Sequence, residues 1–438
     1  MMKLLIVLVL VLGILAIAQL VRVYELTSRL RGKREEDISA SDNRMNARLM
    51  WLFPFFYFAF FLWLVVKYKN EMLPISASEH GVGYDQLMDF NWYILISVFL
   101  LTNILLFYFS GKYVFNKERR AYWQPHNNKL ELLWTVVPAA VLAVIIIYGL
   151  TSWNRMMSPA TPEALQVEVY GKQFDWTVRY PGRDGVLGAT DYRLINAENP
   201  LGIVTPKSIS TRLEELRTAV AEHEEVLATA ILAPKRREEM VRELESLRRM
   251  QQRIVNLHTL MEQDIAEMGN SSLYLAGADD IVTKDFLLPV DHEALMLIRS
   301  RDVIHSVYVP HMRLQMNAVP GMTTMFKFVP TITTDSMRTV MNNESFDYVM
   351  LCNKICGASH YNMQMPMVIV PKAEYDTWYA EQMGGRTFES PGGGGEGEKE
   401  QENMELPQQQ GDEGRTAVVT PAVDEGSTMN VNRTEQGI

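Results

Sequence analysis

The chain has 438 residues, which is enough for more than one folded unit. Its formal net charge is −10, and residues 385–438, with eleven acids and four bases, account for −7 of it. No basic stretch is interleaved with aromatic residues, which argues against a nucleic-acid partner. Only two cysteines are present, which excludes a disulfide scaffold.

Four apolar stretches lie in the first 150 residues. They are Leu4–Val21, Leu49–Val66, Trp92–Phe109 and Leu132–Leu150. Each is long enough, or nearly so, for the roughly 20 residues that a helix needs to cross a bilayer. The pattern predicts a transmembrane anchor of four helices over residues 1–152.

Basic residues in the loops predict the orientation of these helices. The loop between the first two stretches carries seven basic residues and the loop between the last two carries five, whereas residues 67–91 carry two. Positively charged loops stay in the cytoplasm, so the N-terminus and everything after Leu150 are expected outside. A cleaved signal peptide ending at Ala16-Ile17-Ala18 is the alternative. Cleavage would place the C-terminal half in the cytoplasm, against the charge rule, so four retained helices are favoured.

The exported half, residues 163–384, has the pattern of a β-domain. Residues 165–180 alternate between apolar and polar side chains, and short apolar runs follow over 285–330 and 346–370, separated by Pro, Gly and charged residues. Many short strands of this kind indicate a β-sandwich or a Greek-key barrel.

A helical pattern interrupts this β-domain. Apolar residues recur at heptad spacing between Ser208 and Met268, with a break at Ala233-Pro234. We therefore expect an antiparallel helical hairpin inserted over residues 205–270. His258 falls on its seam, where a polar residue that sets the register is favoured over a metal ligand.

The last segment, residues 385–438, is rich in Gly, Glu, Gln, Ser and Pro. Such a composition buries too little apolar surface to fold, so we expect a disordered acidic tail.

Candidate metal ligands are concentrated in twelve residues. Cys352, Cys356, His360 and Met363 bring two thiols, an imidazole and a thioether together, and His305 lies 47 residues earlier. Soft ligands of this kind select copper or tetrahedral zinc, and the thioether favours copper. A zinc site, or a disulfide between the two cysteines, remains open on ligand chemistry alone.

Three motifs resemble subunit II of the haem–copper cytochrome c oxidases. The first is Cys-x3-Cys-x3-His-x2-Met, preceded by Asp302-Val303-Ile304-His305-Ser306 and by Ala318-Val319-Pro320-Gly321. The others are Glu131–Pro138, which opens the last membrane stretch, and Gly171–Trp176 just after it. The resemblance covers roughly residues 110–185 and 280–380.

The resemblance implies a membrane anchor and a cupredoxin-like domain holding a dinuclear copper centre. In that family two bridging thiolates, here Cys352 and Cys356, bind both coppers. The remaining ligands would be His305, His360, Met363 and the backbone carbonyl of Lys354.

Further roles follow from the same resemblance. The subunit would take electrons from cytochrome c and pass them to a haem-bearing subunit I, which reduces oxygen with proton pumping. Subunit III, membrane lipid and a larger respiratory supercomplex are further expected partners, in a bacterial inner membrane with the copper domain on the periplasmic side. Glu131 would be the entrance of a proton pathway. The alternative is that Glu131 is only a solvated residue at a helix N-terminus, favoured there by the helix dipole.

Two positions depart from the family pattern. Lys354 replaces a glutamate that reaches a magnesium ion at the boundary with subunit I, and an ammonium group cannot ligate a cation. We therefore expect that magnesium site to be absent or rebuilt. Phe174 replaces a tryptophan through which electrons enter, so Phe174 and Trp176 are both candidates for this role, with a purely structural Trp176 as the alternative.

Three rival functions differ from this interpretation in features that the sequence shows. A quinol oxidase subunit would have a degenerate copper site, but the five side-chain ligands are intact. A zinc-stabilised membrane anchor without catalytic function would bind zinc instead of copper. The copper domain of a nitrous oxide reductase would have neither the Glu131 helix nor four membrane spans.

Overall fold

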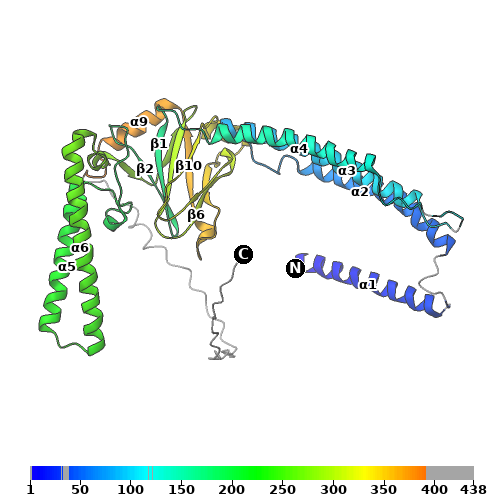
Figure 1. Ribbon diagram of the computed structural model, residues 1–438, viewed down its shortest axis with the longest axis horizontal. Helices are drawn as coiled ribbons and strands as arrows, with labels where there is room; N and C mark the ends of the chain where they lie inside the picture. Colours follow the sequence, from blue (N-terminus) through cyan, green and yellow to red (C-terminus); the bar gives the residue numbers. More distant parts are fainter. Residues whose placement is uncertain (1, 31, 33–38, 117, 121, 391–438) are drawn as a thin grey trace, which may run out of the picture. The chain divides into compact units, whose positions relative to one another are not determined.

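The computed structural model describes residues 2–30, 32, 39–116, 118–120 and 122–390 (Figure 1). The expected tail from residue 391 onward lies outside this range. Residues 386–390, which the sequence also assigned to the tail, are held by backbone hydrogen bonds from Phe388 to Asp280 and from Glu389 to Ala278.

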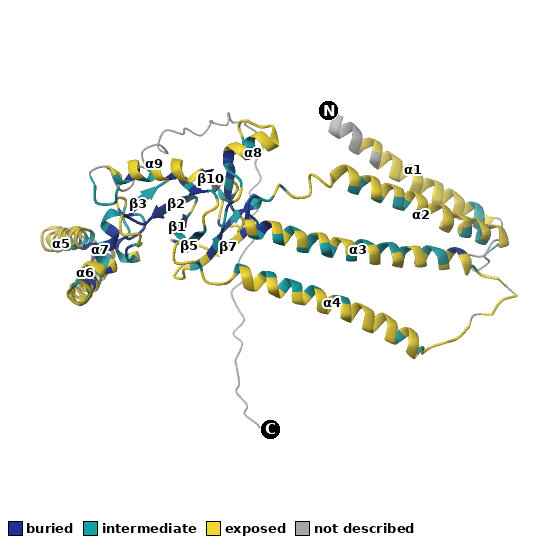
Figure 2. Ribbon diagram, turned by 90° about the horizontal axis from the view of Figure 1, so that it is seen from above, coloured by how far each residue is buried: buried dark blue, intermediate teal, exposed yellow. Residues whose placement is uncertain are grey.

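The N-terminal part consists of four helices: α1 (Met2–Leu30), α2 (Ala40–Tyr68), α3 (Glu79–Lys112) and α4 (Asn128–Met156). All four are long and apolar enough to cross a membrane. Their apolar side chains are largely exposed, as the yellow helices of Figure 2 show. A long apolar surface that no protein covers is expected where lipid is the solvent. The predicted four-helix anchor is confirmed.

The start of α3 is hydrogen bonded to the β-domain. The amide of Ala77 donates to the carbonyl of His311 over 2.7 Å, and Ser78 forms an isolated β-bridge with Pro330. Arg313 makes a bidentate ion pair with Asp85, with both N–O distances 2.8 Å. The segment that leads into α3 therefore lies on the same side of the membrane as the β-domain, as the loop charges predict.

The β-domain is a sandwich of two five-stranded sheets. One sheet has the order β3-β2-β1-β5-β8 and the other β4-β10-β9-β6-β7. The strands are β1 (Leu165–Lys172), β2 (Asp175–Tyr180), β3 (Ile281–Thr283), β4 (Phe286–Pro289), β5 (Ala294–Ser300), β6 (His305–Val309), β7 (Leu314–Ala318), β8 (Thr324–Phe328), β9 (Tyr348–Cys352) and β10 (Gln364–Val370). Two pairs, β1 with β5 and β4 with β10, are parallel, and the others are antiparallel.

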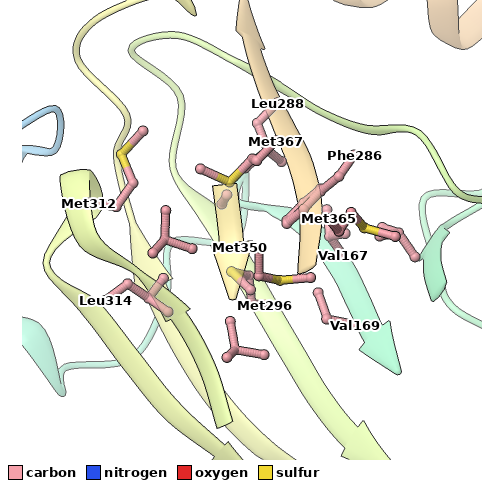
Figure 3. Packing of buried hydrophobic residues seen from close by; sticks show 14 of the residues in the cluster. Val167, Val169, Phe286, Leu288, Met296, Met312, Leu314, Met350, Met365 and Met367 are labelled. Atoms are coloured by element: carbon pink, nitrogen blue, oxygen red, sulfur yellow. The ribbon is translucent and has the colours of Figure 1, made fainter. Parts of the chain in front are cut away.

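The core between the two sheets follows from strand periodicity. Strands β5 and β9 alternate between buried and half-buried residues, so that one face of each points inward. Figure 3 shows that Met296, Met350, Met365 and Met367 pack there beside Val167. Unbranched thioether side chains fill irregular gaps between two sheets. The all-β class expected for this domain is confirmed, as a sandwich of two sheets.

The insertion between β2 and β3 is the predicted helical hairpin, formed by α5 (Pro206–Thr229) and α6 (Pro234–Met268) (Figure 1). A capping box between Thr205 and Ser208 starts α5. The two arms bury an apolar seam that comprises Ile209, Leu216, Ile254, Leu257 and Met261. His258 lies at the edge of this seam, partly exposed and 3.5 Å from Glu262.

A buried ionic cluster fastens both ends of the insertion to the first sheet. Arg179 on β2 pairs with Glu168 on β1 and with Asp280, and Arg299 on β5 also pairs with Glu168. The Arg179 guanidinium additionally donates to the carbonyl of Gly188. The cluster thus joins the start and the end of the insertion to three neighbouring strands. The remaining helices are α7 (Leu273–Ala276), α8 (Thr334–Met341) and α9 (Lys372–Met383).

Candidate metal centre

Two neighbouring strands of the second sheet bring the predicted ligands together at one end of the sheet. Strand β6 begins at His305 and strand β9 ends at Cys352, and the two strands are antiparallel neighbours with Val307 opposite Cys352. Residues distant in sequence therefore become adjacent. The ligand loop, residues 353–363, follows β9 at this end of the sheet. A hydrogen bond from the amide of Cys352 to the carbonyl of Met363 joins the two ends of the loop.

The predicted donor atoms converge around the two thiol sulfurs. His305, Cys352 and Cys356 offer donor atoms that all lie within 4.8 Å of one another. The Sγ atoms are 3.9 Å apart, and Nδ1 of His305 is 3.8 Å from Sγ of Cys352. On the other side, Nδ1 of His360 and Sδ of Met363 lie 3.6 and 3.7 Å from Sγ of Cys356.

The backbone carbonyl of Lys354 lies beside one of the two thiols. Its carbonyl oxygen lies 3.2 Å from Sγ of Cys352, while the residue as a whole is exposed. The donor set therefore includes a carbonyl oxygen that does not depend on the side chain at this position.

Both cysteines are free, buried thiols. Their 3.9 Å separation is far greater than the roughly 2.05 Å of a disulfide. Burial, and then the adjacent Cys352, raise the pKa of the Cys356 thiol to about 11. In the absence of a cation the site therefore favours the protonated thiol, and metal binding must displace a proton.

Asp302 orients one of the imidazoles. Its Oδ1 lies 2.8 Å from Nε2 of His305, whose side chain is completely buried. This contact assigns the ring proton to Nε2 and leaves Nδ1 free to face the sulfurs. Partial burial alone would raise the pKa of Asp302, but hydrogen bonds from the Gln173 amide, from His305 and from the Val303 amide hold that pKa below its usual value.

Phe174 in the β1–β2 turn and Trp176 on strand β2 approach the centre in different ways. The half-buried Phe174 ring packs on Gly357, where an added Cβ would lie 2.7 Å from Cε1 of the ring. Trp176 is completely buried and makes an edge contact with His305, with ring centroids 5.8 Å apart. Of the two, only Phe174 reaches the surface.

Glu131 lies in the first turn of α4, apart from the donor cluster in sequence and in contacts. Its Oε1 accepts a hydrogen bond from the amide of Asn127 at 3.3 Å and is 3.9 Å from Nδ1 of His126. In the first contact, a carboxylate of the first helical turn accepts from the backbone amide of the N-cap residue, Asn127, as in a capping box. The carboxylate remains partly exposed.

Asp302 and Gln173 belong to the sequence motifs, but the sequence alone gives neither of them a role. Asp302 binds His305, and the side-chain amide of Gln173 donates to the carbonyl of Cys356 at 2.5 Å. The spacing of Asp302 three residues before a candidate ligand was the only available signal. The contacts of Gln173 cross 129 and 183 residues of sequence, so no local pattern could reveal them.

Comparisons with known proteins agree on one family. The family model for the transmembrane domain of cytochrome c oxidase subunit II matches residues 66–151, and the model for its periplasmic domain matches residues 257–371. The chain is 27% identical over 292 residues to an alternative cytochrome c oxidase subunit 2 of Bradyrhizobium diazoefficiens, covering 66% of this chain and 76% of that protein. It is 23% identical over 319 residues to a cytochrome c oxidase subunit 2 of Thermostichus vulcanus, covering 72% and 79%.

Among solved structures, the periplasmic domain of subunit II of cytochrome oxidase from Bradyrhizobium japonicum is similar. It is 15% identical, with a TM-score of 0.25, and the match covers 51% of this chain and 96% of that one. The two family models match the chain in the family's own order, membrane helices first and periplasmic domain second. Both matched family models and both relatives are cytochrome c oxidase subunit II, and helix α1 and most of helix α2 precede the residues that the models match.

Proposed function

We propose that this chain binds two copper ions, accepts electrons from cytochrome c outside the membrane and passes them to the haem of subunit I. Subunit I would then reduce oxygen to water and pump protons. The observation that carries the proposal is the convergence of two imidazoles, one thioether and one backbone carbonyl on two thiol sulfurs that lie 3.9 Å apart. The match to both subunit II family models supports a place in a multisubunit oxidase.

The donor set fits copper better than its rivals. A structural zinc takes four ligands and does not use thioethers, whereas Met363 offers a thioether among six donors. A nitrogen donor lies on each side of the sulfur pair: His305 is beside Cys352, and His360 is beside Cys356. A donor set divided in this way suits two metals better than one. Cys352 and Cys356 would hold the two coppers together with the other donors, and the bound pair would supply a one-electron carrier.

The residues of the chain hold this carrier in a fixed frame. The imidazole of His305 and the thioether of Met363 are almost completely buried, so each has one orientation available. Asp302 fixes the tautomer of His305. A ligand frame that is already in place limits rearrangement when the charge changes, which suits rapid electron transfer.

We propose that electrons enter through Phe174. Its ring lies against Gly357 of the ligand loop and is partly exposed, whereas Trp176 is buried behind His305. Phe174→Ala should lower the rate of electron acceptance from cytochrome c and leave copper content unchanged. Trp176→Phe keeps an aromatic ring in the core and should leave that rate near the wild-type value. The opposite ranking in stopped-flow reduction would contradict the assignment.

We propose that no magnesium ion binds beside the ligand loop as it does in the family. The Lys354 side chain is cationic and exposed, and an ammonium group repels a divalent ion. Its charge would occupy the place of the cation at the boundary with subunit I. Metal analysis of the purified complex that finds one magnesium bound at this boundary would contradict this proposal.

We propose that Glu131 is a proton entrance on the cytoplasmic side. Its carboxylate is partly exposed at the start of α4, beside His126, in a loop rich in basic residues. Glu131→Gln keeps the contact to Asn127 and removes the ionisable group, so turnover and proton uptake should both fall. Glu118→Gln, in the same loop, is the matched control. Unchanged turnover and proton uptake in Glu131→Gln would reduce the residue to a helix cap.

The remaining assignments concern partners, location and organisation. We propose that subunit III, membrane lipid and a larger respiratory supercomplex surround the chain in a bacterial inner membrane, with the β-domain in the periplasm. The proposed organisation is an anchor over 1–152, a copper domain over 163–384 with its hairpin over 205–270, and a tail over 385–438. Isolation of the complex in mild detergent, with identification of its co-purifying subunits, tests these partners.

A further inference from the structure

The β1–β2 turn is hydrogen bonded to two separate segments that carry candidate metal ligands. On one side, the backbone amide of Gln173 donates to Oδ2 of Asp302 at 2.7 Å, while Oδ1 of the same carboxylate is 2.8 Å from Nε2 of His305. Both oxygens of Asp302 are therefore engaged. The carboxylate joins an imidazole donor to the turn.

On the other side, the turn reaches the ligand loop. The side-chain amide of Gln173 donates to the backbone carbonyl of Cys356 at 2.5 Å. This carbonyl immediately precedes Gly357, which has a φ of +151° and lies under the Phe174 ring. The hydrogen bond therefore fixes the peptide plane that follows one of the two thiols.

These contacts form one continuous path, His305–Asp302–Gln173–Cys356, which we call the outer brace. It runs outside the donor atoms and joins strand β6 to the ligand loop through a turn of the opposite sheet. Hydrogen bonds to metal ligands from surrounding groups set the orientation of those ligands and change metal affinity by 10–100-fold when removed.

We propose that Asp302 and Gln173 are positioning residues that hold the His305 imidazole and the Cys356 thiol at a fixed separation. The inference rests on the proposed copper function. Asp302 acts by aiming Nδ1 of His305 toward the sulfurs, and Gln173 acts by holding the backbone of Cys356 against the turn. Since both act through the same turn, loss of either one releases both ends of the outer brace.

Isosteric substitutions test the outer brace in the full-length chain within its oxidase complex. Asp302→Asn replaces one acceptor oxygen with an NH₂ group that faces a donor. Gln173→Glu replaces the donor to the Cys356 carbonyl with an oxygen. The matched controls are Asp285→Asn and Gln315→Glu, which make the same changes at exposed positions whose side chains have no hydrogen bond among the described residues.

The measurements are the rate of copper release to a chelator and the electron paramagnetic resonance spectrum of the oxidised complex. Each single variant should release copper about tenfold faster, or more, and should show an altered copper hyperfine pattern. The double variant should release copper little faster than either single variant. Both substitutions break the same chain of hydrogen bonds, so their effects should not add. The controls should match the wild type.

Two outcomes would contradict this inference in distinguishable ways. Wild-type release rates and spectra in both single variants, with copper present in the wild type, would overturn the outer brace alone. A wild-type complex without copper would overturn the proposed function and the outer brace together. If Asp302→Asn does not fold, Gln173→Glu carries the test, because Gln173 is exposed and its replacement has the same volume.

Discussion

Gly357 illustrates how a single position limits the candidate centre. Its φ of +151° lies in a region that residues with a Cβ rarely adopt, and an added Cβ would lie 2.7 Å from the Phe174 ring. Both effects act on the same short loop. The residue that follows Cys356 must therefore be small and conformationally free.

Gly357→Ala should destabilise the β-domain by about 1–3 kcal/mol, because a strained backbone conformation has that cost. It should also slow electron acceptance by displacing Phe174. Gly321→Ala is the matched control, since Gly321 also has a positive φ, +77°, but has no neighbour within 4 Å of an added Cβ. Urea unfolding and stopped-flow reduction provide the measurements. Equal electron-acceptance rates in the two variants would contradict the packing argument.

Asp280 gives the β-domain a pH dependence. Its carboxyl is buried, and desolvation outweighs the attraction of Arg179 and raises its pKa from 3.8 to about 7. A raised pKa means that the folded state binds the proton more tightly than the unfolded state. The stabilisation is therefore fully present below pH 3.8 and is lost as the pH rises to about 7.

Asp280→Asn should abolish this dependence. The amide keeps an oxygen to accept from Arg179 and Gly188 but carries no charge to desolvate. The thermal unfolding temperature of the wild-type β-domain should fall as the pH rises from about 4 to about 7. The unfolding temperature of the variant should change less over the same range. Parallel melting curves for the two proteins over this range would show that another group titrates.

Sequence patterns predicted the donors better than their surroundings. Cys352, Cys356, His360 and Met363 were predictable because soft ligands lie within twelve residues of one another. The ring proton of His305 was not predictable, because its position depends on the contact with Asp302. The proposed preference for Phe174 over Trp176 likewise rests on burial, which the alternation of residues in the sequence could not give.

The apolar contacts of the helical hairpin form a cluster of their own. Its seam is formed by its own two arms and by the loop at its base, in a cluster separate from the core of the sandwich. An element whose apolar contacts are mainly internal can open without opening its neighbours. We therefore expect the stability of the hairpin to be separable from that of the β-sandwich.

Ile254→Ala should open the hairpin selectively. Ile254 is completely buried in the seam, so its truncation should cost about 2–5 kcal/mol. Val255→Ala, at the adjacent and 41% exposed position, should cost much less. Hydrogen exchange should rise in α5 and α6 of the Ile254 variant and stay unchanged in β9. A comparable rise in β9 would indicate that hairpin and sandwich unfold together.

Heptad spacing predicted the hairpin, and alternation predicted many strands, but neither predicted the sheet order. Strand β1 pairs in parallel with β5 across the whole insertion, with Leu165 opposite Ala294. A pairing over so long a separation leaves no periodic signal in the sequence. The ionic cluster of Arg179, Glu168 and Asp280 is hidden for the same reason.

On the scale of the whole molecule, membrane topology and the metal centre depend on each other. The asymmetry of loop charges predicted an exported β-domain, and the contacts of Ala77 and Arg313 agree, because they join the start of α3 to that domain. The family's membrane model begins at residue 66, so α1 and most of α2 precede the part that it matches. A membrane protein with an exported domain and a cluster of soft donors is suited to receive electrons from outside.

The metal content of the purified, full-length complex tests the central claim most directly. Metal analysis combined with electron paramagnetic resonance of the oxidised protein should find two coppers on this chain and one unpaired electron shared between them. Cys356→Ser should remove the shared signal. One zinc, or a disulfide between Cys352 and Cys356 with no copper, would contradict the account.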